Sequence, residues 1–259
     1  MDALIYLIII MGLFIGSFLN VCIYRIPEKQ SICFPRSHCM KCGHVLGALE
    51  LIPVISYLAL GRRCKQCKEP ISSRYMGIEI VTGLGFGVIY YVYRYSLETL
   101  LYSTFFCFAL VLTMIDWDHM ILPTRVIRWG LGLGLIERIL QSIVSNNKYL
   151  LIDALLGAIV GYVFFMIVYY GSQWLLKKEG LGYGDVRLMG FLGLFVGFNQ
   201  LFLMIIISCI LASVFGLVLL KVRKSSEPYP LGPFLNGGAL IVILWGERLL
   251  QSYLSLFNL

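Results

Sequence analysis

The sequence predicts an all-α polytopic membrane protein with about eight transmembrane helices and a zinc-ribbon-like cytoplasmic loop after the first helix. Three observations predict this fold. The 259-residue chain is 59% hydrophobic with a mean hydropathy of +0.85, well above the values of soluble domains. Apolar runs of about 20 residues, long enough to cross a bilayer as a helix, recur along the chain. One polar segment, residues 25–74, carries two C-x2-C pairs.

Eight apolar runs predict the eight spans. The first run, residues 4–24, lacks the basic start and the small-residue cleavage site of a signal peptide, so we expect it to be retained as a helix. The run at 187–198 is too short to cross unless the loop before it or the turn after it enters the membrane. The other spans are expected at residues 75–92, 97–115, 125–143, 150–176, 200–220 and 233–253.

Basic residues predict the orientation of these spans. With the N-terminus outside, most of the 21 Lys and Arg residues fall in cytoplasmic loops, as the positive-inside rule requires. An even number of spans then places the C-terminus outside as well. This scatter of charge over short loops argues against nucleic-acid binding despite the net charge of +7. The basic residues expected toward the other side are Arg94, Arg138, Lys148 and Arg248.

Two glycine-rich stretches lie inside predicted spans, at residues 83–87 and 130–134. Small residues let the backbones of membrane helices approach each other closely. Both stretches therefore predict close helix packing.

Four cysteines in the polar segment predict a metal site. Cys39, Cys42, Cys64 and Cys67 form two C-x2-C pairs, and each pair can occupy two corners of a tetrahedron. We expect structural Zn²⁺ with no open coordination position. Free thiols or a redox pair are the alternatives. His38 and His44 are surplus to the four ligands, and the scattered cysteines do not form a disulfide framework; these are Cys22, Cys33, Cys107 and Cys209.

Asp116 and Asp185 are candidate catalytic residues. The predicted topology puts both on the cytoplasmic side, and two close carboxylates can share a proton, one acting as base and the other as acid. Gly182 and Gly184, before the second acid, permit a close approach of backbone or substrate. A helix cap is the alternative role for Asp185.

Two other acids compete with this pair. Asp118 is as well placed as Asp116 by spacing alone. Glu79 lies inside the second predicted span, where an ionisable residue is expensive, although buried pairing with a basic loop residue would also explain it.

The ordered blocks of the chain resemble the type IV prepilin peptidase family, within the GxGD class of intramembrane aspartyl proteases. The resemblance covers nearly the whole chain and includes the C-x2-C pairs, the acid seven residues before Pro123, and the G-x-G-D of residues 182–185. Further blocks are Gly16-Ser17-Phe18-Leu19-Asn20, Ile52-Pro53, Arg74-Tyr75 with Glu79, and Leu231-Gly232-Pro233-Phe234. Thr124 and Met40 depart from the family pattern.

The resemblance implies a role for each part. It selects Asp116 over Asp118 as partner of Asp185. It implies cleavage of the basic leader from prepilin-like proteins at the cytoplasmic face of the bacterial inner membrane, followed by N-methylation with S-adenosylmethionine. The expected partners are such substrates and membrane lipids. The expected division is a first helix (1–24), a zinc-binding loop that would also carry the methyltransferase activity (25–74) and a peptidase core (75–259).

Two other functions remain in view. A non-catalytic membrane scaffold could use the zinc loop to bind a partner, but the pair of acids argues against it. A transporter could use intramembrane acids as proton relays, but the chain lacks the paired broken helices of inverted repeats.

Overall fold

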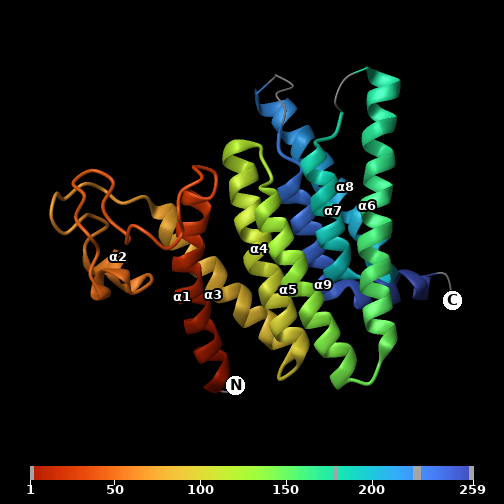
Figure 1. Ribbon diagram of the computed structural model, residues 1–259, viewed down its shortest axis with the longest axis horizontal. Coiled ribbons are helices and arrows are strands. Elements are labelled where there is room, and N and C mark those ends of the chain that lie inside the picture. Colours follow the sequence, from red (N-terminus) through yellow and green to blue (C-terminus); the bar gives the residue numbers. More distant parts are fainter. Residues whose placement is uncertain (1–2, 178–179, 224–228, 257–259) are drawn as a thin grey trace. The chain divides into compact units, whose positions relative to one another are not determined.

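The computed structural model describes residues 3–177, 180–223 and 229–256, and these are helical wherever they form regular structure. The all-α prediction is confirmed, since the described residues contain isolated bridges but no strand. The helices are α1 (Ala3–Arg25), the short 3-10 helix η1 (Ala48–Leu51), α2 (Ile55–Ala59), α3 (Ser73–Tyr93), α4 (Leu97–His119), α5 (Thr124–Val144), α6 (Lys148–Leu176), α7 (Tyr183–Val196), α8 (Phe198–Arg223) and α9 (Gly232–Leu256) (Figure 1).

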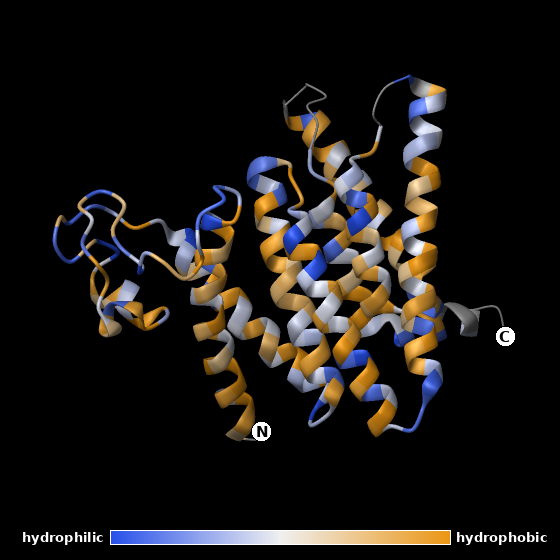
Figure 2. Ribbon diagram, viewed as in Figure 1, coloured by the Kyte–Doolittle hydropathy of each residue, from blue (hydrophilic) through white to orange (hydrophobic). Residues whose placement is uncertain are grey.

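Six helices in the described parts of the chain are long and apolar enough to cross a membrane: α1, α3, α4, α6, α8 and α9. The other two predicted spans also form helices. However, α5 and α7 fall outside this set, and the 14 residues of α7 extend only about 21 Å. In Figure 2 the long helices are mainly apolar, whereas polar residues concentrate in the segment before α3 and at helix ends.

The chain forms two compact units, Met1–Thr99 and Leu100–Leu259. In the first unit α1 packs closely against α3. A Cβ on Gly12 would lie 2.8 Å from the Cα of Gly83, and a Cβ on Gly87 would lie 2.9 Å from the Ile9 side chain. The predicted close packing of the first glycine stretch is therefore confirmed at Gly83 and Gly87.

The second unit is built around α7. Every residue of α7 from Val186 to Val196 is buried except Arg187. The helix packs against α5, α6, α8 and α9, and the ring of Phe105 in α4 also contacts its phenylalanines. A Cβ on Gly193 would overlap the backbone of Gly157 in α6, so these two helices are in backbone contact. Because protein surrounds α7 on all sides, its short length does not leave its backbone facing lipid.

The second glycine stretch also faces α7, but it accommodates side chains. A Cβ on Gly130 would lie 2.6 Å from the ring of Phe191. A Cβ on Gly134 would likewise overlap the ring of Phe195. Gly132 has open space around it. The phenylalanine rings of α7 therefore fill the notches left by two glycines of α5.

Candidate active site and metal centre

Asp116 lies in the last turn of α4 and is buried, with 5% of its surface exposed. Its Oδ2 accepts a 3.0 Å hydrogen bond from the backbone N–H of Gly232, the first residue of α9. The first N–H groups of a helix have no partner inside it, so α9 offers this donor to the carboxylate. Asp118 is exposed, because two residues turn a helix by about 200°.

Asp185 lies half-buried in the first turn of α7, just before its fully buried part. A Cβ on Gly182 would lie 3.0 Å from Asp185 Oδ2, so the absence of a side chain at Gly182 leaves space for this carboxylate. The negative charge of Asp116 acts on the Asp185 carboxyl group. The two carboxylates are therefore close enough to interact, although they lie on different helices.

Leu122, in the loop between α4 and α5, brings these segments together. A Cβ on Gly184 would lie 3.1 Å from Leu122 Cβ, and a Cβ on Gly232 would lie 3.5 Å from Leu122 Cδ2. The starts of α7 and α9 thus pack against one side chain. This contact places Asp185 at the same end of the unit as Asp116.

Arg187 and Tyr183 connect the start of α7 to two neighbouring helices. Its guanidinium carbon lies 4.5 Å from the centre of the Tyr183 ring, and Nη1 donates to the hydroxyl of Thr124 at the start of α5. The hydroxyls of Tyr183 and Tyr162 of α6 lie 3.4 Å apart. Thr124, which departs from the family pattern, is therefore the acceptor for Arg187, and the residue that caps α5 is Pro123.

Glu79 belongs to the first unit, where it is buried in α3. Its Oε2 accepts a 2.8 Å hydrogen bond from the backbone N–H of Val54. A backbone amide is therefore one partner of this buried carboxylate.

The four predicted metal ligands form one cluster. The sulfurs of Cys39, Cys42, Cys64 and Cys67 all lie within 4.8 Å of one another. The Cys39–Cys67 and Cys42–Cys64 sulfur distances are 3.7 and 3.9 Å. Sulfurs bound to tetrahedral zinc at about 2.3 Å lie about 3.8 Å apart. The spacing and the all-thiol donor set therefore fit Zn²⁺.

The backbone presents the two cysteine pairs in the same way. In each turn the N–H of the first cysteine bonds to the carbonyl five residues later, and the N–H four residues later bonds back to that cysteine. Gly43 and Lys68 occupy equivalent positions with φ of +71° and +59°. The bonds are Cys39 N to His44 O, Gly43 N to Cys39 O, Cys64 N to Glu69 O and Lys68 N to Cys64 O, at 2.8, 2.9, 2.9 and 3.1 Å.

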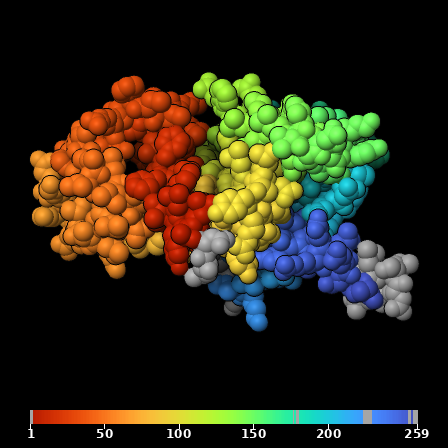
Figure 3. Space-filling model, turned by 90° about the horizontal axis from the view of Figure 1, so that it is seen from below, coloured from red at the N-terminus to blue at the C-terminus, as the bar shows by residue number. Residues whose placement is uncertain are grey.

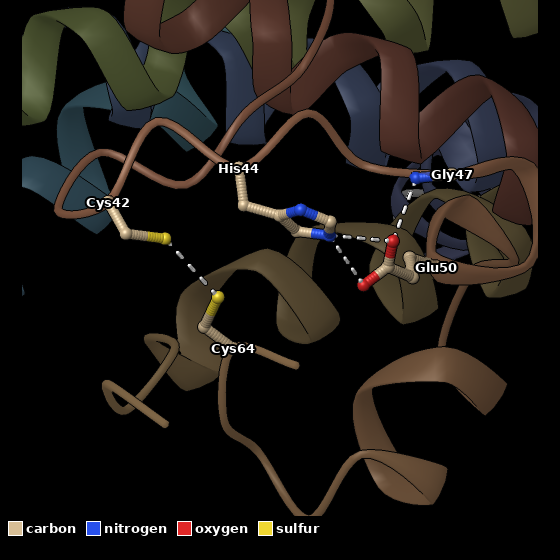
Figure 4. Close-up of polar contacts among 5 residues, drawn as sticks. All are labelled: Cys42, His44, Gly47, Glu50 and Cys64. Carbon is tan, nitrogen blue, oxygen red and sulfur yellow. Dashed lines mark hydrogen bonds and ion pairs between the residues drawn. The ribbon is translucent and has the colours of Figure 1, made fainter. Parts of the chain in front are cut away.

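The histidines beside the cluster have other partners. Figure 4 shows the His44 ring directed toward Glu50, with 3.1 Å between His44 Nε2 and Glu50 Oε2. The Gly47 amide donates to the same oxygen at 2.8 Å. This amide, with a smaller effect of His44, lowers the pKa of Glu50. His38 Nδ1 lies 2.9 Å from the Arg36 carbonyl oxygen.

Comparison with known proteins covers most of the chain. Residues 10–93 match the bacterial peptidase A24 N-terminal domain, and residues 103–217 match the type IV leader peptidase family. The chain is 36% identical to the prepilin leader peptidase/N-methyltransferase of Pseudomonas putida over 96% of this chain and 93% of that protein. It is 33% identical to that of Pseudomonas aeruginosa over 95% and 92% of the two chains. The chain belongs to the type IV leader peptidase family.

Membership of the type IV leader peptidase family confirms the resemblance that the motifs indicated. The prepilin leader peptidase/N-methyltransferase of Aeromonas hydrophila is also similar, at 34% identity over 97% of this chain and 94% of that protein. No solved structure matches the chain. Together with the six apolar helices, the family makes this a multi-pass protein of the bacterial inner membrane.

Gly232 and Leu122 are residues of the site that the motifs do not single out. Gly232 belongs to one of the family blocks, but its contact with Asp116 joins two distant helices. A Cβ on Gly232 would lie 2.5 Å from Asp116 Oδ2. Besides that block, the available signal was a glycine directly before Pro233 at a helix start, where proline is common.

We expect Gly232→Ala to lower kcat for leader cleavage by about 10²-fold, the scale of a 1 Å displacement of a reacting group. The added methyl group must displace the Asp116 carboxylate or the start of α9. Gly237→Ala in the same helix is the matched control, because its Cβ would meet only Leu211 Cδ1 at 3.7 Å, an ordinary contact. Cleavage assays on the purified variants measure both effects. Equal activity of the two variants would contradict the role of Gly232.

Proposed function

We propose that this protein is an aspartyl endopeptidase that removes the basic leader of prepilin-like substrates and then methylates the new N-terminus. The observation that carries the proposal is the meeting of α4, α7 and α9 around Leu122, which brings Asp116 and Asp185 together. The curated relatives, similar over nearly the whole chain, are named for both activities. We assign the catalytic roles to Asp116 and Asp185, supported by Gly182 and Gly184.

The two carboxylates divide the work of hydrolysis. Asp116 accepts a hydrogen bond from the Gly232 amide, which favours its ionised form, so we assign the shared proton to Asp185. Asp116 takes a proton from a water molecule as that water attacks the peptide carbonyl carbon. Asp185 gives its proton to the carbonyl oxygen, which stabilises the tetrahedral intermediate. Collapse of this intermediate breaks the C–N bond, and the proton held by Asp116 passes to the leaving amine.

Positive charge supports a cytoplasmic active site. The first two turns of α5, which follow Asp116 along the chain, carry Arg125 and Arg128, and Arg187 follows Asp185. Loops with such charge remain inside. In this orientation both termini lie outside, and residues 25–74 lie in the cytoplasm. The apolar N-terminal helix of the substrate lies among the spans, which leaves its leader at the cytoplasmic surface.

Methyl transfer is the second proposed activity, and we assign it to residues 25–74. Cys39, Cys42, Cys64 and Cys67 would hold Zn²⁺ with all four coordination positions filled. The metal would therefore act by folding this segment rather than by binding a reactant. S-adenosylmethionine would supply the methyl group when bound.

Mass spectrometry of the substrate N-terminus tests both activities together. The full-length protein in detergent is incubated with a prepilin-like substrate, with and without S-adenosylmethionine. We expect loss of the leader in both samples and one added methyl group only with the methyl donor. An uncut substrate would overturn the proposal, and a cut substrate without the methyl group would remove its second part.

A further inference from the structure

The turn between α7 and α8 is a single residue buried inside the second unit. α7 ends at Val196, Gly197 has φ +81°, and α8 begins at Phe198. Such a tight turn leaves the last carbonyls of α7 and the first N–H groups of α8 without helical partners. A buried backbone group without a hydrogen-bond partner destabilises the fold. The turn therefore depends on side chains from its neighbours.

The turn lies well inside the end of the helix bundle. The residues that reach it are Arg138, six residues before the end of α5, and Asp153, five residues after the start of α6. At about 1.5 Å per residue, the turn therefore lies roughly 8 to 9 Å, measured along the helices, from the loop that connects α5 and α6. Figure 1 shows this connection, in green, extending beyond the end of α7. Figure 3 shows the green side chains of the connection at the surface of this end.

Arg138 completes the C-terminal end of α7. Its side chain is buried, with 6% of its surface exposed. Nη2 donates a hydrogen bond to the backbone carbonyl of Phe195, and Nη1 donates to Gln141 Oε1 at 3.0 Å. The guanidinium also lies 5.8 Å from the centre of the Tyr102 ring. A positive charge at a helix C-terminus interacts favourably with the helix dipole.

Asp153 completes the N-terminal end of α8. Its Oδ1 accepts a 3.2 Å hydrogen bond from the backbone N–H of Asn199, and a negative charge at a helix N-terminus is favourable. A Cβ on Gly197 would overlap the Asp153 carboxylate. The turn must therefore be glycine for its backbone angle and also for the carboxylate to reach α8.

We propose that Arg138 and Asp153 are positioning residues. They fix the position of α7 along its own axis within the second unit and thereby hold Asp185 opposite Asp116. Asp185 lies ten residues before Phe195 in the same unbroken helix, so a shift at one end of α7 moves the other end. The inference rests on the proposed function only in that Asp185 is catalytic. The catalytic end of α7 is then held partly from its opposite end, about 15 Å away.

Two measurements on Arg138→Met and Arg138→Lys test this role. Arg138→Met keeps the length of the side chain but removes its donors, whereas Arg138→Lys retains a cationic donor. We expect kcat for leader cleavage to fall about 10- to 100-fold with Met, KM to change little, and Lys to restore most of the loss. Arg138→Met and Arg138→Lys with equal kcat would overturn the proposal.

The rate of forming a disulfide cross-link reports the position of α7 along its axis and does not depend on catalysis. A Cβ on Gly190 would lie 3.4 Å from Tyr162 Cβ of α6, close to the disulfide mean of about 3.8 Å. In the pair Gly190→Cys and Tyr162→Cys, added Arg138→Met should slow disulfide formation several-fold. An unchanged rate would overturn the inference. Slower cross-linking together with a fully active Asp185→Asn would instead overturn the catalytic assignment and leave the positioning of α7 intact.

Two further variants separate positioning from loss of stability. Asp153→Ala removes the second contact of the turn, so it should slow both cleavage and cross-linking, as Arg138→Met does. It also keeps the test informative if Arg138→Met does not fold. Asn147→Ala is the matched control. It removes a helix cap, the 3.1 Å bond from Tyr149 N to Asn147 Oδ1, at the start of α6 and away from α7. Equal losses in kcat for Asn147→Ala and Asp153→Ala would contradict the proposal.

Discussion

Asp116→Asn and Asp185→Asn are each expected to lower the rate of leader cleavage by at least about 10²- to 10⁴-fold, the contribution of a positioned acid or base. Asparagine keeps the shape of the side chain but can neither take a proton from water nor donate one as an acid. Asp116→Asn can still accept the Gly232 N–H bond through its amide oxygen, so the start of α9 is preserved. Single-turnover cleavage by the purified variants measures the loss.

The controls for this prediction come from the same part of the chain. Asp118→Asn changes an exposed carboxylate on the far side of α4 and should cut at the parent rate. The double variant Asp116→Asn with Asp185→Asn should be no slower than either single variant, because residues that act as a unit do not add. Normal processing by either single variant would remove that residue from the catalytic pair.

The choice between Asp116 and Asp118 illustrates what a sequence can decide. Spacing along a helix places both acids near the end of α4, and the family resemblance was needed to choose between them. Burial supports the same choice on physical grounds, because Asp116 faces the start of α9 and Asp118 faces outward. That difference depends on a helix beginning more than a hundred residues later, which no local pattern contains.

The fold was predictable where hydropathy alone decides it. Six long apolar helices follow from composition and length, because an apolar stretch of about 20 residues must be helical in lipid. Length alone does not decide the case of α7, because the 20-residue rule applies to a helix that faces lipid. Neighbouring helices cover α7, so its backbone does not have to face lipid. The burial of Arg138 was not predictable from the sequence either, because one of its two acceptors, the carbonyl of Phe195, belongs to another helix.

The metal centre was more predictable than the active site. Cysteine spacing within each turn fixes two ligands locally, and two such turns in one loop define four ligands. The candidate active site instead depends on contacts of Gly184 and Gly232 with Leu122, where the informative feature is the missing Cβ. Sequence marks these glycines but not the side chain that they accommodate.

Cys64→Ser is expected to remove most of the bound zinc and to unfold residues 26–74, all of which the structure describes. In this segment the buried residues are Pro53, Tyr57 and Cys64, too few to form a hydrophobic core. Zinc bound to such sites contributes about 10–16 kcal/mol to folding. Loss of one thiolate should therefore greatly reduce metal content and make the segment sensitive to proteolysis. Metal analysis and limited proteolysis of the purified variant measure both effects.

Cys33→Ser is the matched control, because Cys33 is an exposed cysteine of the same segment that lies outside the four-sulfur cluster. It should retain the full zinc content and resistance to protease. The rate of leader cleavage gives a further comparison. The proposed catalytic acids lie in the second unit, so in Cys64→Ser the zinc content should fall by a far larger factor than the rate of leader cleavage. A protein that loses its zinc but keeps residues 26–74 resistant to protease would show that the metal is not what folds this segment.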